Sequence, residues 1–306
     1  MSFDSPETTR IDVPVAGGSL ATFRFEGPRR GLPTVLAVHG MTASSQGWRA
    51  VTRALSGRVS VVAPDLRGRG RSNGLPGPYG MAAHARDMLA VLDHLGLERA
   101  VLVGHSLGAY IIARAAAEHP DRVAAVVLVD GGLPIPSSRG ADPQRFIESF
   151  LGPSLARLQM TFGSREDYRT WWRRHPAFAA GDIDDADIVA YADHDVVGKP
   201  PALRSSVSEE AVRGDAAELF TMGEPAHRLA VPATLVCAPR GLLDDPNPMQ
   251  PVELVQAWAA EAPNQRRMLP VPDVNHFTIA LGRAGAGAVA ATIEEALGVS
   301  AAAPTP

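Results

Sequence analysis

The stretch VLVGHSLGA, Val101–Ala109, decides the fold of this chain because it joins a short apolar run to a helical pattern over Tyr110–His119. A serine on such a sharp strand-to-helix turn needs small residues two positions before and after it, because its strained backbone approaches neighbouring elements closely. Gly104 and Gly108 meet this need around Ser106. The N-terminal end of the following helix also favours a developing anion. We therefore predict that Ser106 is a nucleophile held out into a cleft.

A serine hydroxyl is a poor nucleophile until a base takes its proton, so the sequence must also supply a base. Of the nine histidines, His276 is best placed, in the loop PDVNHF, Pro272–Phe277, between the last apolar run and the C-terminal helical pattern. Loop residues at this place gather at the C-terminal edge of a parallel sheet. We predict that His276 is the base. His39 and His105, at the ends of two apolar runs, are expected to have a packing or hydrogen-bonding role.

The third member of such a site is a carboxylate that orients the imidazole, and it should lie between the serine and the histidine in the chain. Asp244 follows the apolar run that ends near Ala238, and it is the predicted acid. Two alternatives are open, because Asp245 is its direct neighbour and Asp130 stands at the end of the preceding apolar run.

An acyl-transfer site also needs hydrogen-bond donors for the tetrahedral oxyanion. The backbone N–H of Leu107 follows the serine directly and is one expected donor. The second is the N–H of Met41, in the loop opened by His39 and Gly40, where the glycine permits a tight turn.

Short β-branched apolar runs alternate with longer helical patterns, and this alternation is typical of a parallel sheet covered by helices on both faces. In the segment from Met81 to Leu97, apolar residues recur three or four positions apart, and Gly96 closes the pattern. A hairpin around Gly17 and Gly18 is predicted at the sheet edge. The runs that predict strands are 10–15, 20–26, 34–39, 59–63, 100–103, 123–129, 233–238 and 268–271.

The alternation stops between Leu133 and about Glu224, where helix-like stretches carry many large side chains and prolines. A connection of this length predicts a functional cap. The aromatic residues of this segment are expected mainly to pack, and the space that a cap encloses above the nucleophile would be largely apolar. The predicted organisation is a core over 1–133, a helical cap over 134–224, the rest of the core over 225–299 and a disordered tail over 300–306. The cap aromatics on which this rests include Phe146, Phe150, Trp171 and Trp172.

The composition favours a globular protein that acts on small molecules. The chain has 306 residues, 45% of them hydrophobic, and a formal net charge of -4. Its charges are interspersed, so no basic field for nucleic acid and no polybasic membrane patch is expected. No run of about eighteen apolar residues and no signal peptide is visible, which predicts a cytoplasmic protein. The single cysteine, Cys237, lies in an apolar run and is expected to be a buried structural thiol.

Two further patterns are set aside, so neither a cofactor nor a metal ion is expected. The run Gly68–Ser72 lacks the third glycine of a dinucleotide fingerprint and the Gly-Lys-Ser/Thr ending of a nucleotide loop. The acidic run Asp182–Asp187 lacks the glycine and the glutamate that a calcium loop needs. The first run is better explained as a structural turn, and the second as the solvated start of a helix.

Together these features resemble the α/β-hydrolase family, over nearly the whole chain. One departure is the stretch Ala238–Gly241, which is longer and richer in proline than the family's usual turn to the acid. The resemblance implies a mostly parallel eight-stranded sheet flanked by helices, with an inserted helical cap. It also implies a nucleophile at Ser106, a base at His276 and oxyanion donors at Met41 and Leu107. Besides the serine motif, the segments that carry the resemblance are 39–40, 65–72 and 273–276.

The function expected from these residues is hydrolysis of an ester, lactone or thioester of a hydrophobic small molecule through an acyl-enzyme. The same triad in the family also serves C–C bond hydrolysis and cofactor-free perhydrolysis, because a fold and a triad do not determine the substrate. A hypothesis of another class is a ligand receptor that keeps the pocket but does not turn over. The oligomeric state is open.

Overall fold

The computed structural model describes residues 7–26, 31–135, 142, 145, 148, 152 and 155–299. The predicted tail over 300–306 and the predicted packing residues Phe146 and Phe150 lie outside these ranges.

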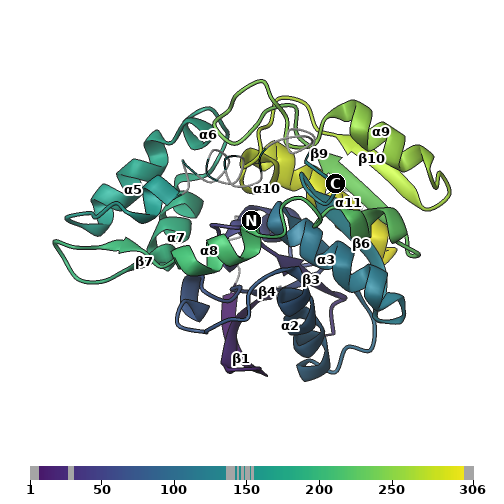
Figure 1. Cartoon of the computed structure of the whole chain (residues 1–306), viewed down its shortest axis with the longest axis horizontal. Helices are drawn as coiled ribbons and strands as arrows, with labels where there is room; N and C mark the ends of the chain where they lie inside the picture. Colours follow the sequence, from purple (N-terminus) through teal and green to yellow (C-terminus); the bar gives the residue numbers. More distant parts are fainter. Residues whose placement is uncertain are drawn as a thin grey trace, which may run out of the picture.

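An eight-stranded sheet forms the centre of the molecule (Figure 1). Its first two strands form the predicted antiparallel hairpin at one edge, and the other six strands run parallel to one another. The α/β fold class predicted from the sequence is therefore confirmed. In spatial order the strands are β1 (Glu7–Val15), β2 (Gly18–Glu26), β4 (Ser60–Pro64), β3 (Thr34–Val38), β5 (Ala100–His105), β6 (Val123–Val129), β9 (Ala233–Cys237) and β10 (Arg266–Pro270).

Helices cover both faces of the sheet, and the central strands are apolar on both sides for that reason. Leu36 and Val38 of β3 belong to the core beneath one layer of helices, whereas Val35 and Ala37 belong to the core of the opposite face. This alternation follows from the two-residue period of a strand. One layer holds α2 (Met81–His94), α3 (Leu107–Glu118) and α9 (Val252–Ala260), and the other holds α1 (Arg49–Ala54) and α11 (Arg283–Leu297).

The end of α2 shows how local sequence sets a helix boundary. The helix stops at His94, three residues before the end of the predicted pattern. Gly96 has a φ of 67°, and the N–H of Leu97 donates to the carbonyl of Leu92 across 2.9 Å. This is the glycine-based C-terminal turn that the sequence indicates, since glycine adopts positive φ without a Cβ clash.

The segment between β6 and β9 contains helices, as predicted, and we call residues 134–224 the cap segment. Its large aromatic side chains pack on one another, with Tyr168, Trp172 and Phe178 all buried in one apolar cluster. The packing role expected for Trp172 is thus confirmed. A short hairpin that the sequence did not predict, β7 (Val196–Val197) with β8 (Arg204–Ser205), accompanies the helices. The described helices are α5 (Arg165–Arg174), α6 (Pro176–Ala179), α7 (Asp185–Asp195) and α8 (Glu209–Ala216).

The limits of the helical cap, placed at residues 134 and 224 from the sequence, stay predictions. In Figure 1, α5, α6 and α7 lie together at one side of the molecule, away from the edge formed by β10 and α9.

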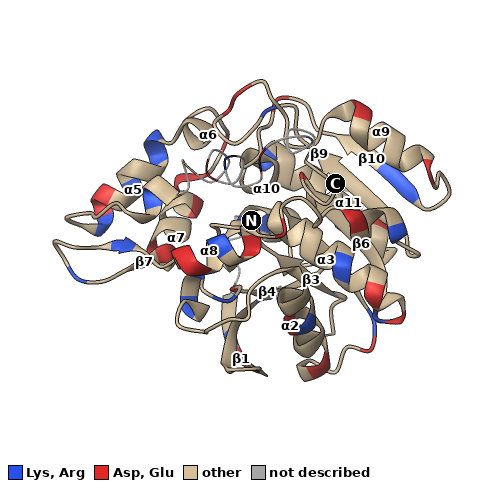
Figure 2. Cartoon of the chain, in the orientation of Figure 1, with Lys and Arg blue, Asp and Glu red and all other residues tan. Residues whose placement is uncertain are grey.

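Charged residues of both signs are interspersed along the helices, as Figure 2 shows. The acidic run at the start of α7 is held by arginines. Asp185 pairs with Arg173 of α5, and Asp187 pairs with Arg49 and Arg53 of the main domain, by which we mean the described residues outside the cap segment. The two ion pairs of Asp187 connect the cap segment to α1. Among the described helices, none is both long and apolar enough to cross a membrane.

Candidate active site

Ser106 is the single residue between the end of β5 and the first residue of α3. Its φ of 54° and ψ of -120° lie in a region that non-glycine residues rarely adopt, and such strain is typical of functional positions. The backbone around it is held on both sides, because its N–H donates to the carbonyl of Val129 across 2.9 Å and its carbonyl accepts from the N–H of Ala109. The turn predicted from the sequence is confirmed.

The two glycines of the motif are required by close backbone contacts. A Cβ on Gly104 would lie 2.3 Å from the carbonyl oxygen of Gly108, and a Cβ on Gly108 would lie 2.0 Å from that of Val38. Both distances are far below van der Waals contact. Strand β5, helix α3 and strand β3 can therefore meet beneath Ser106 only if these two positions lack a side chain.

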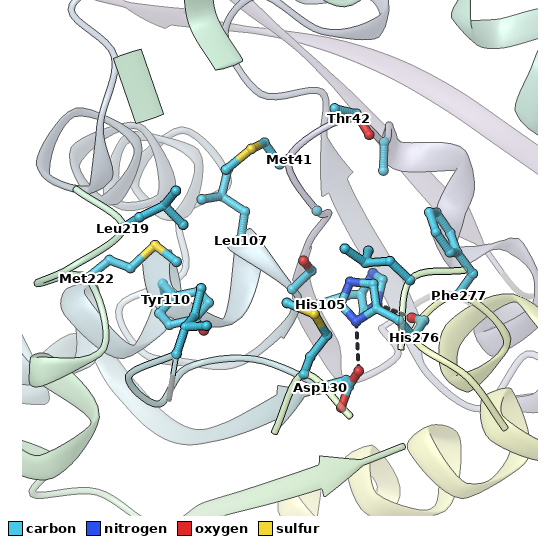
Figure 3. Close-up of a pocket in the computed structure, with 16 residues that line it drawn as sticks. Met41, Thr42, His105, Leu107, Tyr110, Asp130, Leu219, Met222, His276 and Phe277 are labelled. Carbon is cyan, nitrogen blue, oxygen red and sulfur yellow. Dashed lines mark hydrogen bonds and ion pairs between the residues drawn. The ribbon is translucent and has the colours of Figure 1, made fainter. Parts of the chain in front are cut away.

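Ser106 opens into a pocket that also receives His276 and Asp130, shown in Figure 3. Its walls are mostly apolar, and the ionisable side chains among the described lining residues are His105, Asp130, His276 and Tyr110. The lining residues are Gly40, Met41, Thr42, Ala43, His105, Ser106, Leu107, Tyr110, Asp130, Ile135, Leu219, Met222, Leu242, Met249, His276 and Phe277.

His276 is buried, and its Nδ1 lies 2.7 Å from Oδ2 of Asp130 (Figure 3). An ionised carboxylate only accepts hydrogen bonds, so this contact places the ring proton on Nδ1. The other ring nitrogen, Nε2, is then left with a lone pair that can accept a proton. The second oxygen of Asp130 accepts from the N–H of Ala238 across 3.1 Å, so both carboxylate oxygens are held.

The carboxylate beside His276 is thus the alternative Asp130, which corrects the preference for Asp244. Asp244 accepts from the side chain of Asn275 across 3.0 Å and pairs with Arg240. Asp245 instead accepts from the backbone N–H groups of its own loop. The reason is geometric: Asp130 directly follows the last residue of β6 and its carboxylate reaches the imidazole, whereas Asp244, in the loop after β9, reaches the neighbouring Asn275 instead.

The oxyanion loop, which we define as residues 40–42, is oriented by His39. The N–H of Leu66 donates to Nε2 of His39 across 2.9 Å, so the proton of this ring is on Nδ1, which donates to the carbonyl of Gly40 across 2.8 Å. Burial lowers the pKa of His39 to about 4, and the ring is neutral at pH 7. Because the peptide is trans, fixing the Gly40 carbonyl also fixes the direction of the N–H of Met41.

Neither predicted oxyanion donor, Met41 N–H or Leu107 N–H, donates a hydrogen bond within the described part of the chain. The Leu107 amide is among those that a helix leaves without an internal partner at its first turn. Both residues line the pocket of Ser106. Their amides are therefore available to a negatively charged oxygen at this place.

Arg69, in the run set aside as a structural turn, is fully buried and supports the same loop. Its Nε donates to the carbonyl of Met41 across 2.9 Å, and its Nη2 pairs with Asp215 of α8. The other oxygen of Asp215 contacts Nε2 of His84 across 2.9 Å. Burial opposes ionisation of Asp215, but Arg69 and His84 together lower its pKa to about 2. The sequence gives no signal for this cluster, because its members are far apart in the chain.

His105 connects the nucleophile turn to the histidine loop. Its Nε2 donates to the backbone carbonyl of His276 across 2.7 Å, and the two rings lie 4.8 Å apart. Burial, followed by the nearby His276, lowers the pKa of His105 to about 3, so this ring is also neutral at pH 7. The hydrogen-bonding role expected for His39 and His105 is confirmed.

Within the described ranges, no three histidine, cysteine, aspartate or glutamate side chains gather closely enough to hold a metal ion. Cys237 is buried, and burial raises the pKa of its thiol to about 11, which fits the structural role expected for it.

Comparison with known proteins adds relatives of several activities. A lipase of Mycobacterium tuberculosis, LipV, is 34% identical over 144 residues, which cover 46% of this chain and 53% of the lipase. A Caulobacter vibrioides protein named as a carbamate hydrolase, RutD, is 42% identical over 106 residues, which cover 34% of this chain and 39% of that protein. The chain thus spans less than two thirds of the length of these relatives.

Solved structures match over almost the whole chain. E-2-(acetamidomethylene)succinate hydrolase superimposes with a TM-score of 0.75 at 20% identity, covering 95% of this chain and all of that one. The thioesterase domain from the curacin biosynthetic pathway gives 0.72 at 20% identity, over 94% of this chain and 99% of that one. At this identity the likeness shows the fold alone. The model of the alpha/beta hydrolase fold family matches residues 33–188, just over half of the sequence. The chain therefore belongs to the α/β-hydrolase fold family.

Proposed function

We propose that this chain is a serine hydrolase that cleaves an ester, lactone or thioester of a neutral, hydrophobic small molecule. The observation that carries the proposal is the shared pocket of Ser106 on its strained turn and His276, whose Nδ1 is held by Asp130. This is the arrangement of an activated hydroxyl nucleophile, its base and an orienting acid.

In the proposed reaction, Oγ of Ser106 attacks the substrate carbonyl carbon while Nε2 of His276 takes the hydroxyl proton. Asp130 stabilises the imidazolium that forms. The N–H groups of Met41 and Leu107 hold the oxyanion of the tetrahedral intermediate. The intermediate collapses, the bond from the carbonyl carbon to the leaving group breaks (C–O in an ester or lactone, C–S in a thioester), and His276 protonates the departing oxygen or sulfur. Water, deprotonated by His276, then attacks the acyl-enzyme. The bond from the acyl carbon to Oγ of Ser106 breaks, and His276 returns the proton to Oγ, which frees the acid and restores Ser106.

The charges of the pocket favour a neutral substrate. Its described lining includes no lysine or arginine, and its one carboxylate, Asp130, is already paired with His276. A substrate carboxylate would therefore be desolvated without a partner, which is costly. We expect the butyrate ester of p-nitrophenol to be cleaved about 100-fold better than its hemisuccinate, which has the same chain length but an anionic end.

The test of the proposal is covalent labelling followed by turnover. A fluorophosphonate is expected to label the wild-type protein stoichiometrically and to leave Ser106→Ala unlabelled. Esters of p-nitrophenol of graded chain length, lactones and aromatic C–C cleavage substrates then separate ester hydrolysis from the other reactions of the family. A folded protein with an unreactive Ser106 would contradict the enzyme hypothesis and favour a receptor that binds without turnover. The cytoplasmic location stays a prediction.

A further inference from the structure

The oxyanion loop is contacted by a buried cation from the cap segment. Nη2 of Arg157 donates to the carbonyl of Thr42 across 3.1 Å. Thr42 lines the pocket of Ser106 and directly follows Met41, whose amide is a proposed oxyanion donor. A side chain of the cap segment therefore holds the backbone one residue from the site where charge develops.

Arg157 is itself held rigidly on the side away from this loop. Its side chain is 3% exposed, and its Nη1 donates to the hydroxyl of Tyr168 at 2.7 Å, to Asp195 at 2.9 Å and to the hydroxyl of Ser205 at 3.1 Å. The guanidinium also lies over the ring of Trp172, 5.0 Å from its centroid. The planar fork of arginine thus has one nitrogen in the polar core of the cap segment and the other on the oxyanion loop.

The oxyanion loop is consequently held at each of its three carbonyls by a buried side chain. Those of Gly40 and Met41 are held by residues of the main domain, and only that of Thr42 depends on Arg157. A hydrogen bond from a charged donor is stronger than one between neutral groups. The position of the cap segment and the geometry of the oxyanion loop are therefore linked through two guanidinium groups. Arg157 reaches the loop from the cap segment, and Arg69 reaches it from the main domain while pairing with Asp215 of the cap segment.

We propose that Arg157 is a positioning residue for the oxyanion hole, through which the cap segment holds the loop in its reactive geometry. The proposal rests on the proposed serine hydrolase function. Arg157 does not touch the reacting atoms. Its loss displaces a donor instead of removing one, so the expected loss in kcat is about 10- to 100-fold, below the 10²- to 10³-fold of a deleted oxyanion donor.

The test compares Arg157→Lys with Tyr168→Phe. Lysine keeps the charge beside Asp195 but lacks the second nitrogen that reaches Thr42. Phenylalanine removes a hydroxyl that contacts Arg157 and Asp195 while leaving the bond to Thr42 in place. We expect Arg157→Lys to lower kcat about 10- to 100-fold with KM changed less than about threefold, and Tyr168→Phe to keep kcat within about threefold of the wild type.

Inhibitor binding separates oxyanion geometry from general damage to the pocket. A trifluoromethyl ketone forms a tetrahedral adduct with an oxyanion, whereas the corresponding secondary alcohol does not. Arg157→Lys is expected to lower the affinity for the ketone by the same factor by which it lowers kcat. The affinity for the alcohol is expected to stay unchanged. An equal loss for both ligands, or equal kinetics of the two variants, would overturn the proposal.

A double variant covers the case in which Arg157→Lys does not fold. Arg157→Met with Asp195→Asn removes the buried ion pair without leaving one charge unpaired. It is expected to show the same selective loss of kcat and of ketone affinity, and normal kcat in this variant would also overturn the proposal. Wild-type protein that is neither labelled by fluorophosphonate nor active would contradict the proposed function itself, whereas an active wild type with unaffected Arg157 variants would contradict this inference alone.

Discussion

Oδ2 of Asp130 lies 2.7 Å from Nδ1 of His276, and Oδ1 of the same carboxylate accepts from the backbone of Ala238, at the end of the neighbouring strand β9. The Asp130 side chain is fully buried. The two contacts hold the carboxylate between two strand ends and hold the imidazole in the tautomer that a base requires.

Asp130→Asn is expected to lower kcat by about 10⁴-fold, because an amide cannot stabilise the imidazolium and favours the wrong tautomer. The measurement is steady-state hydrolysis of a p-nitrophenyl ester, and circular dichroism checks that the variant folds. Asp244→Asn and Asp245→Asn are the matched controls, each expected within about tenfold of the wild type. A larger loss in Asp244→Asn than in Asp130→Asn would return the acid to the loop after β9.

Local sequence patterns do not determine which of these aspartates contacts His276. Ser106, His276 and the parallel sheet follow from local patterns, because each depends on the residues next to it in the chain. The acid depends on how two loops from adjacent strands fold back. One local signal was available: Asp130 is followed by Gly131, where a Cβ would lie 2.6 Å from the Ser106 carbonyl oxygen, so this strand end packs directly against the nucleophile turn.

The polar network behind the oxyanion loop was beyond sequence reasoning for a similar reason. Arg69 and Asp215 are 146 positions apart, and Arg157 and Thr42 are 115 apart. Arginines in a turn and in a helical segment look like surface charges until the cap segment packs onto the main domain. The pattern of apolar residues predicts which elements pack, but it does not predict which charged side chains are buried between them.

His105→Gln is expected to reduce the acid sensitivity of the fold. The pKa of His105 is lowered from 6.5 to about 3, so below pH 6.5 the unfolded chain takes up a proton that the folded chain does not. The titration of His105 therefore leaves the free energy of unfolding unchanged above pH 6.5 and lowers it progressively as the pH falls towards 3. At pH 4 this loss in the free energy of unfolding is about 3 kcal/mol.

Glutamine removes this titration while keeping an N–H donor for the carbonyl of His276. Urea unfolding at pH 7 and pH 4 measures the difference. The wild type should lose about 3 kcal/mol more than His105→Gln between these two pH values. Identical losses would show that His105 titrates normally in the folded protein.

Gly285→Ala is expected to destabilise the C-terminal helix pair. A Cβ at this position of α11 would lie 2.4 Å from Cα of Ile279 in α10 (Thr278–Leu281), the short helix that begins two residues after His276. Backbone atoms cannot yield cheaply, so overpacking of about 2 to 3 kcal/mol is expected. Because the clash also pushes on the histidine loop, kcat should fall together with stability.

Gly287 provides the control on the same helix. It is exposed, and a Cβ there would meet nothing within 4 Å. Gly287→Ala should stabilise the protein by about 0.4 to 1 kcal/mol by restricting the unfolded chain, with kcat unchanged. Urea unfolding of both variants at pH 7 checks the opposite signs, and a neutral effect of Gly285→Ala would refute the close packing of α10 on α11.

Met222→Trp is expected to shorten the acyl chain that the proposed hydrolase accepts. In Figure 3, Met222, Leu219 and Tyr110 lie on the side of the pocket away from His276. The leaving group must lie near His276, which protonates it, and the oxyanion must lie near the amides of Met41 and Leu107. The acyl chain is then directed towards Met222.

Tryptophan at this position should therefore lower kcat/KM for an octanoyl ester by about 10- to 200-fold and leave an acetyl ester within about threefold of the wild type. A series of p-nitrophenyl esters from acetate to octanoate measures the change. Leu243→Trp, at a side chain that is 43% exposed, controls for the introduction of a large ring outside the pocket. Met222→Trp could instead change the preference for the alcohol part in a series of alkyl acetates. That result would place the leaving group, and not the acyl chain, on the Met222 side of the pocket, so the substrate would lie across Ser106 in the opposite direction.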